Sequence, residues 1–527
     1  MTSPIAKLFD SYQKSLAQKR WRPDDIRFNV NVTISRLAFV YEKIRNAIDY
    51  KDEHLLRKNA IERILKRRLF TEIKKTGLAH LLISELIRAR YLPNNMLPER
   101  MIGEVDAIIE KYLRLLSNLN VTRLTKRGRQ TVNWTMSVLA AEIEHYLVPP
   151  FREDGVVECM YKCIKHDVDL AKEIADSSER SIQMYLAIHK VLIKSDPAIL
   201  RYHLLVHLHP EWLKGGDAAI QHLVQHFDAF QKYIEYQLNH PLADKLFRFM
   251  KRFSTVFIIL KDIADQDPSG FPYLMQDREA FEQRIRQACA VRYAKANAKL
   301  RRSYIRTIIY VFFTKMLLAL LFELPYDLYF LKTTNYTPLM INVIFHPILM
   351  FIIAASIRMP SQKNTDKIVE ILMRIAHEEP QPGFLYRKRM TFGRSALVQN
   401  VFRLLNGLTY LVSFGLLVWA LHLLHFNIVS GILFVFFLSI ISFFGLKLRR
   451  EVKDLIIVDK RNSLFSALID FFSVPILSVG QWIAAKTPKI NLFLFVMDFV
   501  IEAPFKIFMD VIEDWINFQK EKREEIM

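Results

Sequence analysis

Carboxylate and imidazole side chains occur inside the most apolar part of this sequence. Glu323 and Asp327 stand four residues apart near the end of one apolar block, and His346 lies within the next block. Residues four apart on a helix share a face, so the two carboxylates are expected to point the same way. Ionisable groups are costly in hydrocarbon and usually face a partner or a water-filled path. Such a set could relay protons or bind a divalent cation.

Two more histidines, His422 and His425, stand at the outer end of the third apolar block. Together with the three residues above they form the predicted intramembrane polar site. In a plainer interpretation, His422, His425 and Asp327 lie among lipid headgroups. Glu323 then pairs with His346 only to hold two helices together. The short connection between the first two blocks predicts an antiparallel hairpin in which those two side chains can meet.

The first half of the chain contains a concentration of histidines. Five of the fifteen fall within 24 residues: His203, His207, His209, His222 and His226. Two pairs, His203/His207 and His222/His226, have the spacing that lets one helical face offer two imidazoles to zinc. Leu204 stands where a zinc protease motif would need glutamate. The four paired histidines are therefore weak candidates for a metal site, and surface or packing roles are the default.

Signatures of catalysis and cofactor binding are absent from the sequence. It contains no G-x-S-x-G nucleophile elbow, no G-x-G-x-x-G and no G-x-x-x-x-G-K-[ST]. Asp265-Gln-Asp-Pro-Ser-Gly270 resembles the opening of an EF-hand loop, but Gln276 replaces the bidentate glutamate at position twelve. A linker between two helices is the better interpretation. We predict no enzyme activity and no cofactor.

Four apolar blocks of 19 to 23 residues follow residue 303: Ile308–Phe330, Pro338–Ile357, Leu404–Leu424 and Ile428–Leu446. Each is long enough to cross a hydrocarbon core about 30 Å thick at about 1.5 Å per helical residue. The sequence therefore predicts a multi-pass membrane protein. Lys315, inside the first block, is expected to extend toward the cytoplasmic surface. Small residues offer surfaces for close helix packing: Gly407, Gly415, Gly431, Ala354, Ala355, Ser439 and Ser442.

Basic residues crowd one side of the predicted membrane. They precede the first span, fill the connection between the second and third, and follow the fourth, whereas the opposite connections carry almost none. The positive-inside rule then predicts that both termini are cytoplasmic, in a cell (inner) membrane. The net charge of +20 is explained by juxtamembrane residues attracted to anionic lipid, so nucleic acid is an unlikely partner. The N-terminus lacks the apolar stretch of a signal peptide, and three cysteines make a poor disulfide framework.

The fold class predicted is all-α, because helix-forming residues dominate and glycine is scarce. Residues 1–303 are expected to form a cytosolic basic helical domain, divisible near 150. Residues 304–446 form a four-helix membrane domain with a cytoplasmic loop at 358–403. The remainder, 447–527, is predicted to re-enter the membrane or lie on it as amphipathic helices, or to add spans for a total of six.

The function predicted first is a non-enzymatic integral membrane protein. Its helical domain would bind a protein partner or the anionic lipid surface on the cytoplasmic face. The alternative is an oligomeric transporter or channel for an ion, a proton or a small solute, using the intramembrane carboxylates and histidines. A homo-oligomer could supply a pore that four spans alone would not.

Overall fold

The computed structural model is helical throughout the part of the chain that it describes. It describes residues 2–18, 26–30, 52–71, 77–121, 124–169, 174, 176–332, 336–381, 383–385, 388–389, 396–458, 464–486 and 515. Two short strands, β1 (Val168–Asp169) and β2 (Lys388–Arg389), form a parallel pair of two residues each. The predicted all-α class is confirmed for these residues.

The chain divides into two compact units. The first is built mainly from Met1–Met250 and Glu379–Met390, and the second from Lys251–Glu378 and Thr391–Asn491. The helices of the first unit are α1 (Ser3–Gln18), α3 (Glu53–Thr71), α4 (Leu78–Arg88), α5 (Arg100–Asn118), α6 (Lys126–Leu147), α7 (Phe151–Ile164), α8 (Ser177–Leu192), α9 (Pro197–Leu208), the 3₁₀ turn η1 (Pro210–Lys214) and α10 (Asp217–Leu238).

The second unit begins within α11 (Ala243–Gln266), which contains the boundary between the units. Its other helices are α12 (Phe271–Leu274), α13 (Arg278–Leu318), the π-helical η2 (Ala319–Glu323), α14 (Leu324–Tyr326), the π-helical η3 (Asp327–Leu331), α15 (Tyr336–Ser356), α16 (Gln362–His377), α17 (Ala396–Leu423), α18 (Ile428–Lys453) and α19 (Leu464–Lys486).

Several helices begin at side-chain caps that the sequence supplies. The hydroxyl of Thr125 accepts from the Gly128 amide at the start of α6, and Asp196 accepts from Ile199 in α9, whose first residue is proline. Asp277 and Asn427 cap α13 and α18 in the same way. Each cap satisfies a backbone N–H that the first helical turn leaves without a partner. Polar residues therefore fix where these helices start.

The first unit encloses one large apolar core shared by α3, α4, α5, α6, α8, α9 and α10. Within it, Glu142 accepts from Lys111 at 2.5 Å, from Tyr112 at 2.6 Å and from Trp212 at 2.9 Å. These bonds join α5, α6 and η1. This buried carboxylate is tolerated because three donors bond to it, one of them the Lys111 ammonium.

A short segment of the predicted cytoplasmic loop belongs to the first unit. The Asp167 carboxylate, which is fully buried, accepts the backbone amides of Gly383 at 2.8 Å, Phe384 at 3.0 Å and Leu385 at 2.7 Å. The strand pair β1–β2 lies directly beyond this contact. Residues 383–385 are therefore held within the first unit by hydrogen bonds from their backbone amides to one side chain.

Four helices of the second unit are long and apolar enough to cross a membrane: Arg278–Phe330, Tyr336–Ser356, Asn400–Leu423 and Ile428–Lys453. They contain the first and fourth predicted blocks, and all but the last residue of the second and third. Large apolar side chains on them face outward, including Tyr310, Leu411 and Ile428, each about 70% exposed. Such surfaces suit lipid rather than water. The four helices suggest a multi-pass membrane protein.

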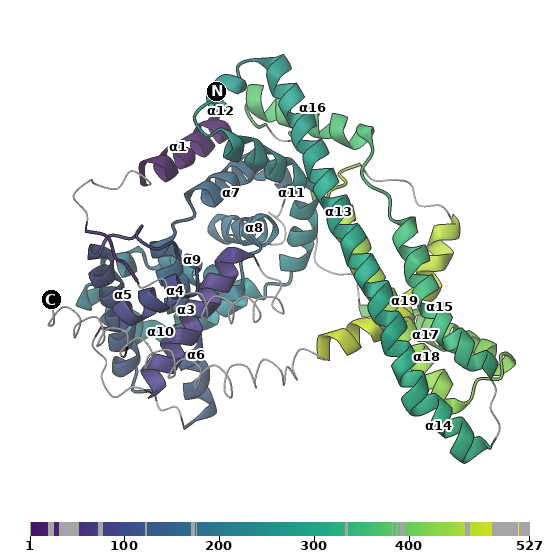
Figure 1. Ribbon diagram of the computed structural model, residues 1–527. Coiled ribbons are helices and arrows are strands. Elements are labelled where there is room, and N and C mark those ends of the chain that lie inside the picture. Colours follow the sequence, from purple (N-terminus) through teal and green to yellow (C-terminus); the bar gives the residue numbers. More distant parts are fainter. Residues whose placement is uncertain are drawn as a thin grey trace, which may run out of the picture. The chain divides into compact units, whose positions relative to one another are not determined.

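The first of these helices extends far beyond its apolar part. It runs without a break from Arg278 to Phe330, through the π-helical turns η2 and η3, and is 53 residues long (Figure 1). Its first half is polar and packs against α16. There Arg286 pairs with Asp366 at 2.7 Å, and Tyr293 accepts from Asn364 at 2.9 Å.

Close helix packing uses glycines other than those predicted. A Cβ added at Gly480 of α19 would lie 2.1 Å from the Ser439 carbonyl oxygen of α18, and one at Gly445 would lie 2.6 Å from Ile353. At Gly407, Gly415 and Gly431, no atom of the described residues lies within 4 Å of such a Cβ. The prediction was wrong for those three glycines because composition alone does not tell a helix–helix face from a lipid-facing one. It was right for Ser439.

The region after the fourth span is described only in part. Ser463–Ala485 was predicted to re-enter, span or lie on the membrane, and the structure has one helix there, α19, packed against α17 and α18. Asn491–Asp514, predicted to be an amphipathic helix, lies outside the described residues.

Candidate functional site

A polar cluster lies buried between the apolar helices of the second unit. Lys315 comes from α13, Glu323 from η2, Asn342 and His346 from α15, and Ser430 from α18. The first four side chains are completely buried, and Ser430 is nearly so. Packing between these helices thus brings together five polar residues that lie between positions 315 and 430 of the sequence. We call these five residues the intramembrane cluster.

Asn342 is the centre of the intramembrane cluster. Its Oδ1 accepts from Lys315 Nζ at 2.5 Å, while its Nδ2 donates to Glu323 Oε1 at 2.7 Å and to the Ser430 carbonyl at 3.2 Å. The Ser430 hydroxyl donates to Glu323 Oε2 at 3.1 Å. Lys315 also lies 4.6 Å from the centre of the Phe437 ring. An ammonium and a carboxylate are therefore held by one neutral amide.

His346 contacts two backbone carbonyls. Its Nδ1 lies 3.0 Å from the Asn342 oxygen and its Nε2 lies 3.1 Å from the Phe434 oxygen. A neutral imidazole has one N–H, so it can donate to only one of these acceptors, whereas an imidazolium donates to both. The rings of Phe345, Phe434 and Phe437 surround it.

Two expectations for this region were wrong. Lys315 does not extend to the membrane surface, because Asn342 offers it a buried acceptor. Glu323 and His346 do not bond to each other. Glu323 accepts from the Asn342 side chain, and His346 contacts two backbone carbonyls. Asn342 and Lys315 were not predicted as site residues, although each is a polar residue in an apolar run, the signal by which His346 was predicted.

Asp327 lies apart from the intramembrane cluster, one helical turn beyond Glu323. Its Oδ1 accepts from Asn427 at 2.6 Å, and Asn427 also caps α18 through the Ser430 amide. His422 and His425 are exposed near the end of α17. The structure therefore brings Glu323 and His346 into one cluster, and leaves Asp327, His422 and His425 outside it.

The helix that carries the two carboxylates is distorted at both. Glu323 ends one π-helical turn, η2, and Asp327 begins another, η3, with Pro325 between them. π-Helical turns widen a helix locally and are frequent at functional sites. Proline leaves one helical hydrogen bond unmade, which helps explain the distortion.

The histidines of the first unit form two groups. His203 packs against His189 with ring centres 4.7 Å apart and against His145 at 5.6 Å, while His207 is exposed. Burial, together with the neighbouring His145, lowers the pKa of His203 to about 3. Burial likewise lowers the pKa of His189 well below its usual range. We call His145, His189 and His203 the buried histidine group.

The second histidine group lies at the surface. His222 and His226 of α10 are exposed, with ring centres 5.1 Å apart, and His209 stacks on His222 at 4.9 Å. Among the described residues, no three or more histidine, cysteine or acidic side chains are arranged to hold a metal ion. Of the two predicted pairs, only His222/His226 keeps its rings in contact.

Exposed cations gather at one end of the apolar helices. They share two properties: each side chain is exposed, and none forms an ion pair with a described residue. They are Arg301, Arg302, Arg306, Arg358, Lys447, Arg449 and Arg450, and we call them the cationic band.

Contacts between the helices place the members of the cationic band at one level. Lys299 of α13 pairs with Glu451 of α18 at 3.0 Å, and Leu300 shares an apolar cluster with Leu448. Ile357, at the end of α15, packs against the same cluster. Some basic residues farther from the apolar part, such as Arg286 and Arg292, have carboxylate partners instead.

Neither the fold nor these sites connects the chain to a known group: it matches no protein-family model, no curated protein and no solved structure.

Proposed function

We propose that this chain is a non-enzymatic multi-pass membrane protein that binds anionic lipid headgroups through the cationic band. Both termini would then lie on the cytoplasmic side, where anionic lipids are abundant. The helical first unit would be held at that surface, where a protein partner could reach it.

The cationic band supports this proposal, because its members have no carboxylate partner among the described residues. Seven exposed cations stand at one end of the apolar parts of three helices, where headgroup phosphates would lie if these helices cross a bilayer. Guanidinium groups pair well with phosphate oxygens, and each basic residue near an anionic leaflet contributes about 1 kcal/mol of attraction. Nearby basic residues that do have acidic partners, such as Lys299 with Glu451, have less charge to offer a lipid.

Lipid selectivity tests the proposal directly. The full-length protein is reconstituted into vesicles, and electron paramagnetic resonance measures how much spin-labelled phosphatidylserine and phosphatidylcholine it immobilises. We expect a preference for phosphatidylserine that weakens as salt is raised, since salt screens exposed charges. Substituting Arg301, Arg302 and Arg306 together by Gln should bring the ratio of the two lipids toward one.

A matched variant controls for net charge. Lys14, Lys126 and Lys232 of the first unit are also exposed and without a partner among the described residues, so their triple substitution by Gln removes the same charge. We expect this control to keep the preference. Equal immobilisation of the two lipids by the unaltered protein, or an equal loss in both triple variants, would contradict the proposal.

Transport is the second candidate function, and the intramembrane cluster favours it. The cluster holds three titratable side chains within the apolar helices, where such groups often mark ion or proton paths. In proteoliposomes that enclose a pH-sensitive dye, a proton pathway through Glu323 predicts flux that Glu323→Gln abolishes. Glu99→Gln, at an exposed carboxylate outside the spans, should leave it unchanged. Flux that is absent, or equal in both variants, would rule this candidate out.

A further inference from the structure

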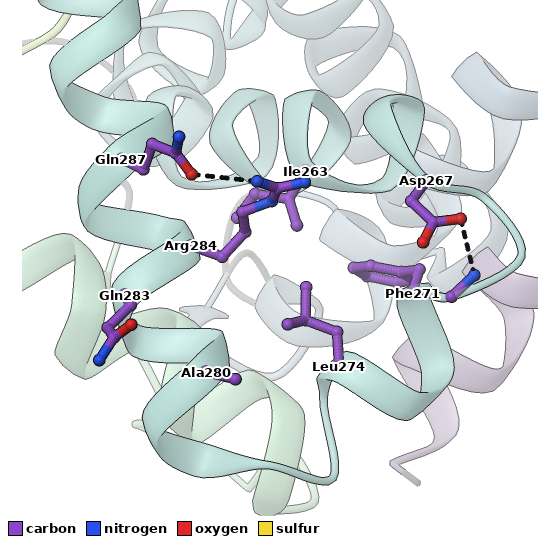
Figure 2. Close-up of a pocket in the computed structure, with 9 residues that line it drawn as sticks. Ile263, Asp267, Phe271, Leu274, Ala280, Gln283, Arg284 and Gln287 are labelled. Atoms are coloured by element: carbon purple, nitrogen blue, oxygen red, sulfur yellow. Dashed lines mark hydrogen bonds between the residues drawn. The ribbon is translucent and has the colours of Figure 1, made fainter.

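A pocket of about 480 Å³ opens between the end of α11, the short helix α12 and the first turns of α13 (Figure 2). Its volume falls in the range of pockets that hold small molecules. Nine residues line it, and five of them carry the argument: Ile263, Phe271, Leu274, Arg284 and Gln287. It is distinct from the intramembrane cluster and from the cationic band.

The linker that resembles an EF-hand opening forms one edge of this pocket. Asp267 accepts the Gly270 amide at 2.9 Å, and a Cβ at position 270 would lie only 2.1 Å from Asp267 Oδ2. A larger residue at position 270 would therefore require the Asp267 carboxylate to move away from the Gly270 amide. The turn places Phe271 against α11, where Phe271 and Ile263 are buried and form an apolar floor.

The polar side of the pocket comes from α13. Arg284 is half-buried, and its guanidinium donates to Gln287 Oε1 at 3.0 Å. No carboxylate in the described part of the chain lies within ion-pair distance of it. Figure 2 shows Asp267 turned toward Gly270 and away from Arg284. The half-buried guanidinium therefore has a neutral partner, and its charge is not compensated by an acid.

We propose that this pocket binds a small organic carboxylate with a compact apolar body. The carboxylate would accept two parallel bonds from Arg284, which is the geometry that guanidinium groups favour. Gln287, released from Arg284, would donate its amide to the same group. The apolar body would lie on Ile263, Phe271 and Leu274. An apolar surface with a few converging polar groups is the usual composition of a small-molecule site.

The probe for this proposal is 4-(trifluoromethyl)benzoate, observed by fluorine NMR with the full-length protein in nanodiscs. Empty nanodiscs supply the correction for partition into lipid. We expect saturable line broadening by the unaltered protein and at least tenfold weaker binding after Arg284→Gln. Arg278→Gln removes an exposed arginine from the same helix outside the pocket, so it should bind within twofold of the unaltered protein.

A second variant separates loss of the site from loss of folding. Ala280→Phe places a ring in the pocket while Arg284 is kept, and it should also abolish binding if the circular dichroism spectrum is unchanged. The neutral 4-(trifluoromethyl)benzamide should bind at least tenfold more weakly than the carboxylate. The proposal is overturned if the unaltered protein shows no saturable broadening, or if Arg284→Gln and Arg278→Gln bind equally well.

Discussion

Lys315 and Glu323 carry opposite charges on one continuous helix, and the Asn342 amide holds both of them. Lys315 donates to Asn342 Oδ1 at 2.5 Å, and Asn342 Nδ2 donates to Glu323 at 2.7 Å. The ammonium and the carboxylate thus interact through the dipole of the Asn342 side-chain amide, which comes from the neighbouring helix α15. The pairing of α13 with α15 therefore depends on a residue that carries no charge.

Replacing Asn342 by Leu should destabilise the membrane unit by about 2 kcal/mol. Hydrogen bonds between membrane helices contribute about 0.6 kcal/mol each, up to about 1.7, and three are lost while two charged groups stay buried. Unfolding in rising sodium dodecyl sulfate measures the change. Asn406→Leu, at an exposed position on α17, should have little effect. Equal stability of both variants would show that the bridge contributes nothing.

Replacing Gly480 by Leu should separate α19 from α18. The new side chain would overlap the Ser439 carbonyl, and overpacking of this kind costs about 1–3 kcal/mol. Thermal unfolding in detergent reports the loss, which we expect as a fall in the melting temperature. Gly415→Leu adds the same side chain where nothing lies within 4 Å. A similar fall in both variants would argue against close packing at Gly480.

The first unit should lose stability in mild acid because of the buried histidine group. The folded state keeps His203 neutral down to a pKa of about 3, whereas an unfolded histidine binds a proton near pH 6.5. The stability associated with neutral His203 is therefore complete above about pH 6.5. It falls by up to about 1.4 kcal/mol per pH unit below that value, and His189 adds a decrease of the same sign.

Urea unfolding of the full chain, followed by tryptophan fluorescence from pH 7.5 to 5, measures this slope. His203→Phe should reduce the loss of stability in acid, because phenylalanine cannot take up a proton. His207→Phe, at an exposed position outside the group, should keep the slope of the unaltered protein. The explanation fails if all three proteins lose stability in parallel.

Replacing Glu142 by Leu should destabilise the first unit by about 3–5 kcal/mol. Lys111 would remain buried without its carboxylate, and Tyr112 and Trp212 would each lose an acceptor. Urea unfolding reports this change as a lower midpoint. Glu110→Leu alters an exposed carboxylate of the same helix, two residues before Tyr112, and should shift stability by less than about 1 kcal/mol.

Apolar run length was enough to predict the spanning helices. Both ends of the second predicted block lie within two residues of the ends of α15, and the fourth block begins where α18 begins. The agreement is close because a long apolar stretch bounded by polar residues has few alternative structures. The far end of α18 is the exception. It continues to Lys453, since nothing in Lys447–Lys453 breaks a helix where the apolar part ends.

The partners of the buried polar residues could not be predicted in the same way. Helical spacing relates Asn342 to His346 on one face, but the contacts of both with α18 depend on how the helices cross. The same holds for Asp167, whose partners are backbone amides more than 200 residues away. Contacts between distant segments require the packed structure, since period and composition describe only one helix at a time.

The uninterrupted helix Arg278–Phe330 makes the second unit responsive to the thickness of the bilayer. At about 1.5 Å per residue its 53 residues extend about 80 Å, and only the later part is apolar. A thinner bilayer is accommodated when a span tilts, and a tilt of about 5° moves the far end of an 80 Å rod by about 7 Å. The free end of the polar half, and the part of α16 that is bonded to it, would therefore be displaced by several ångströms when the span tilts.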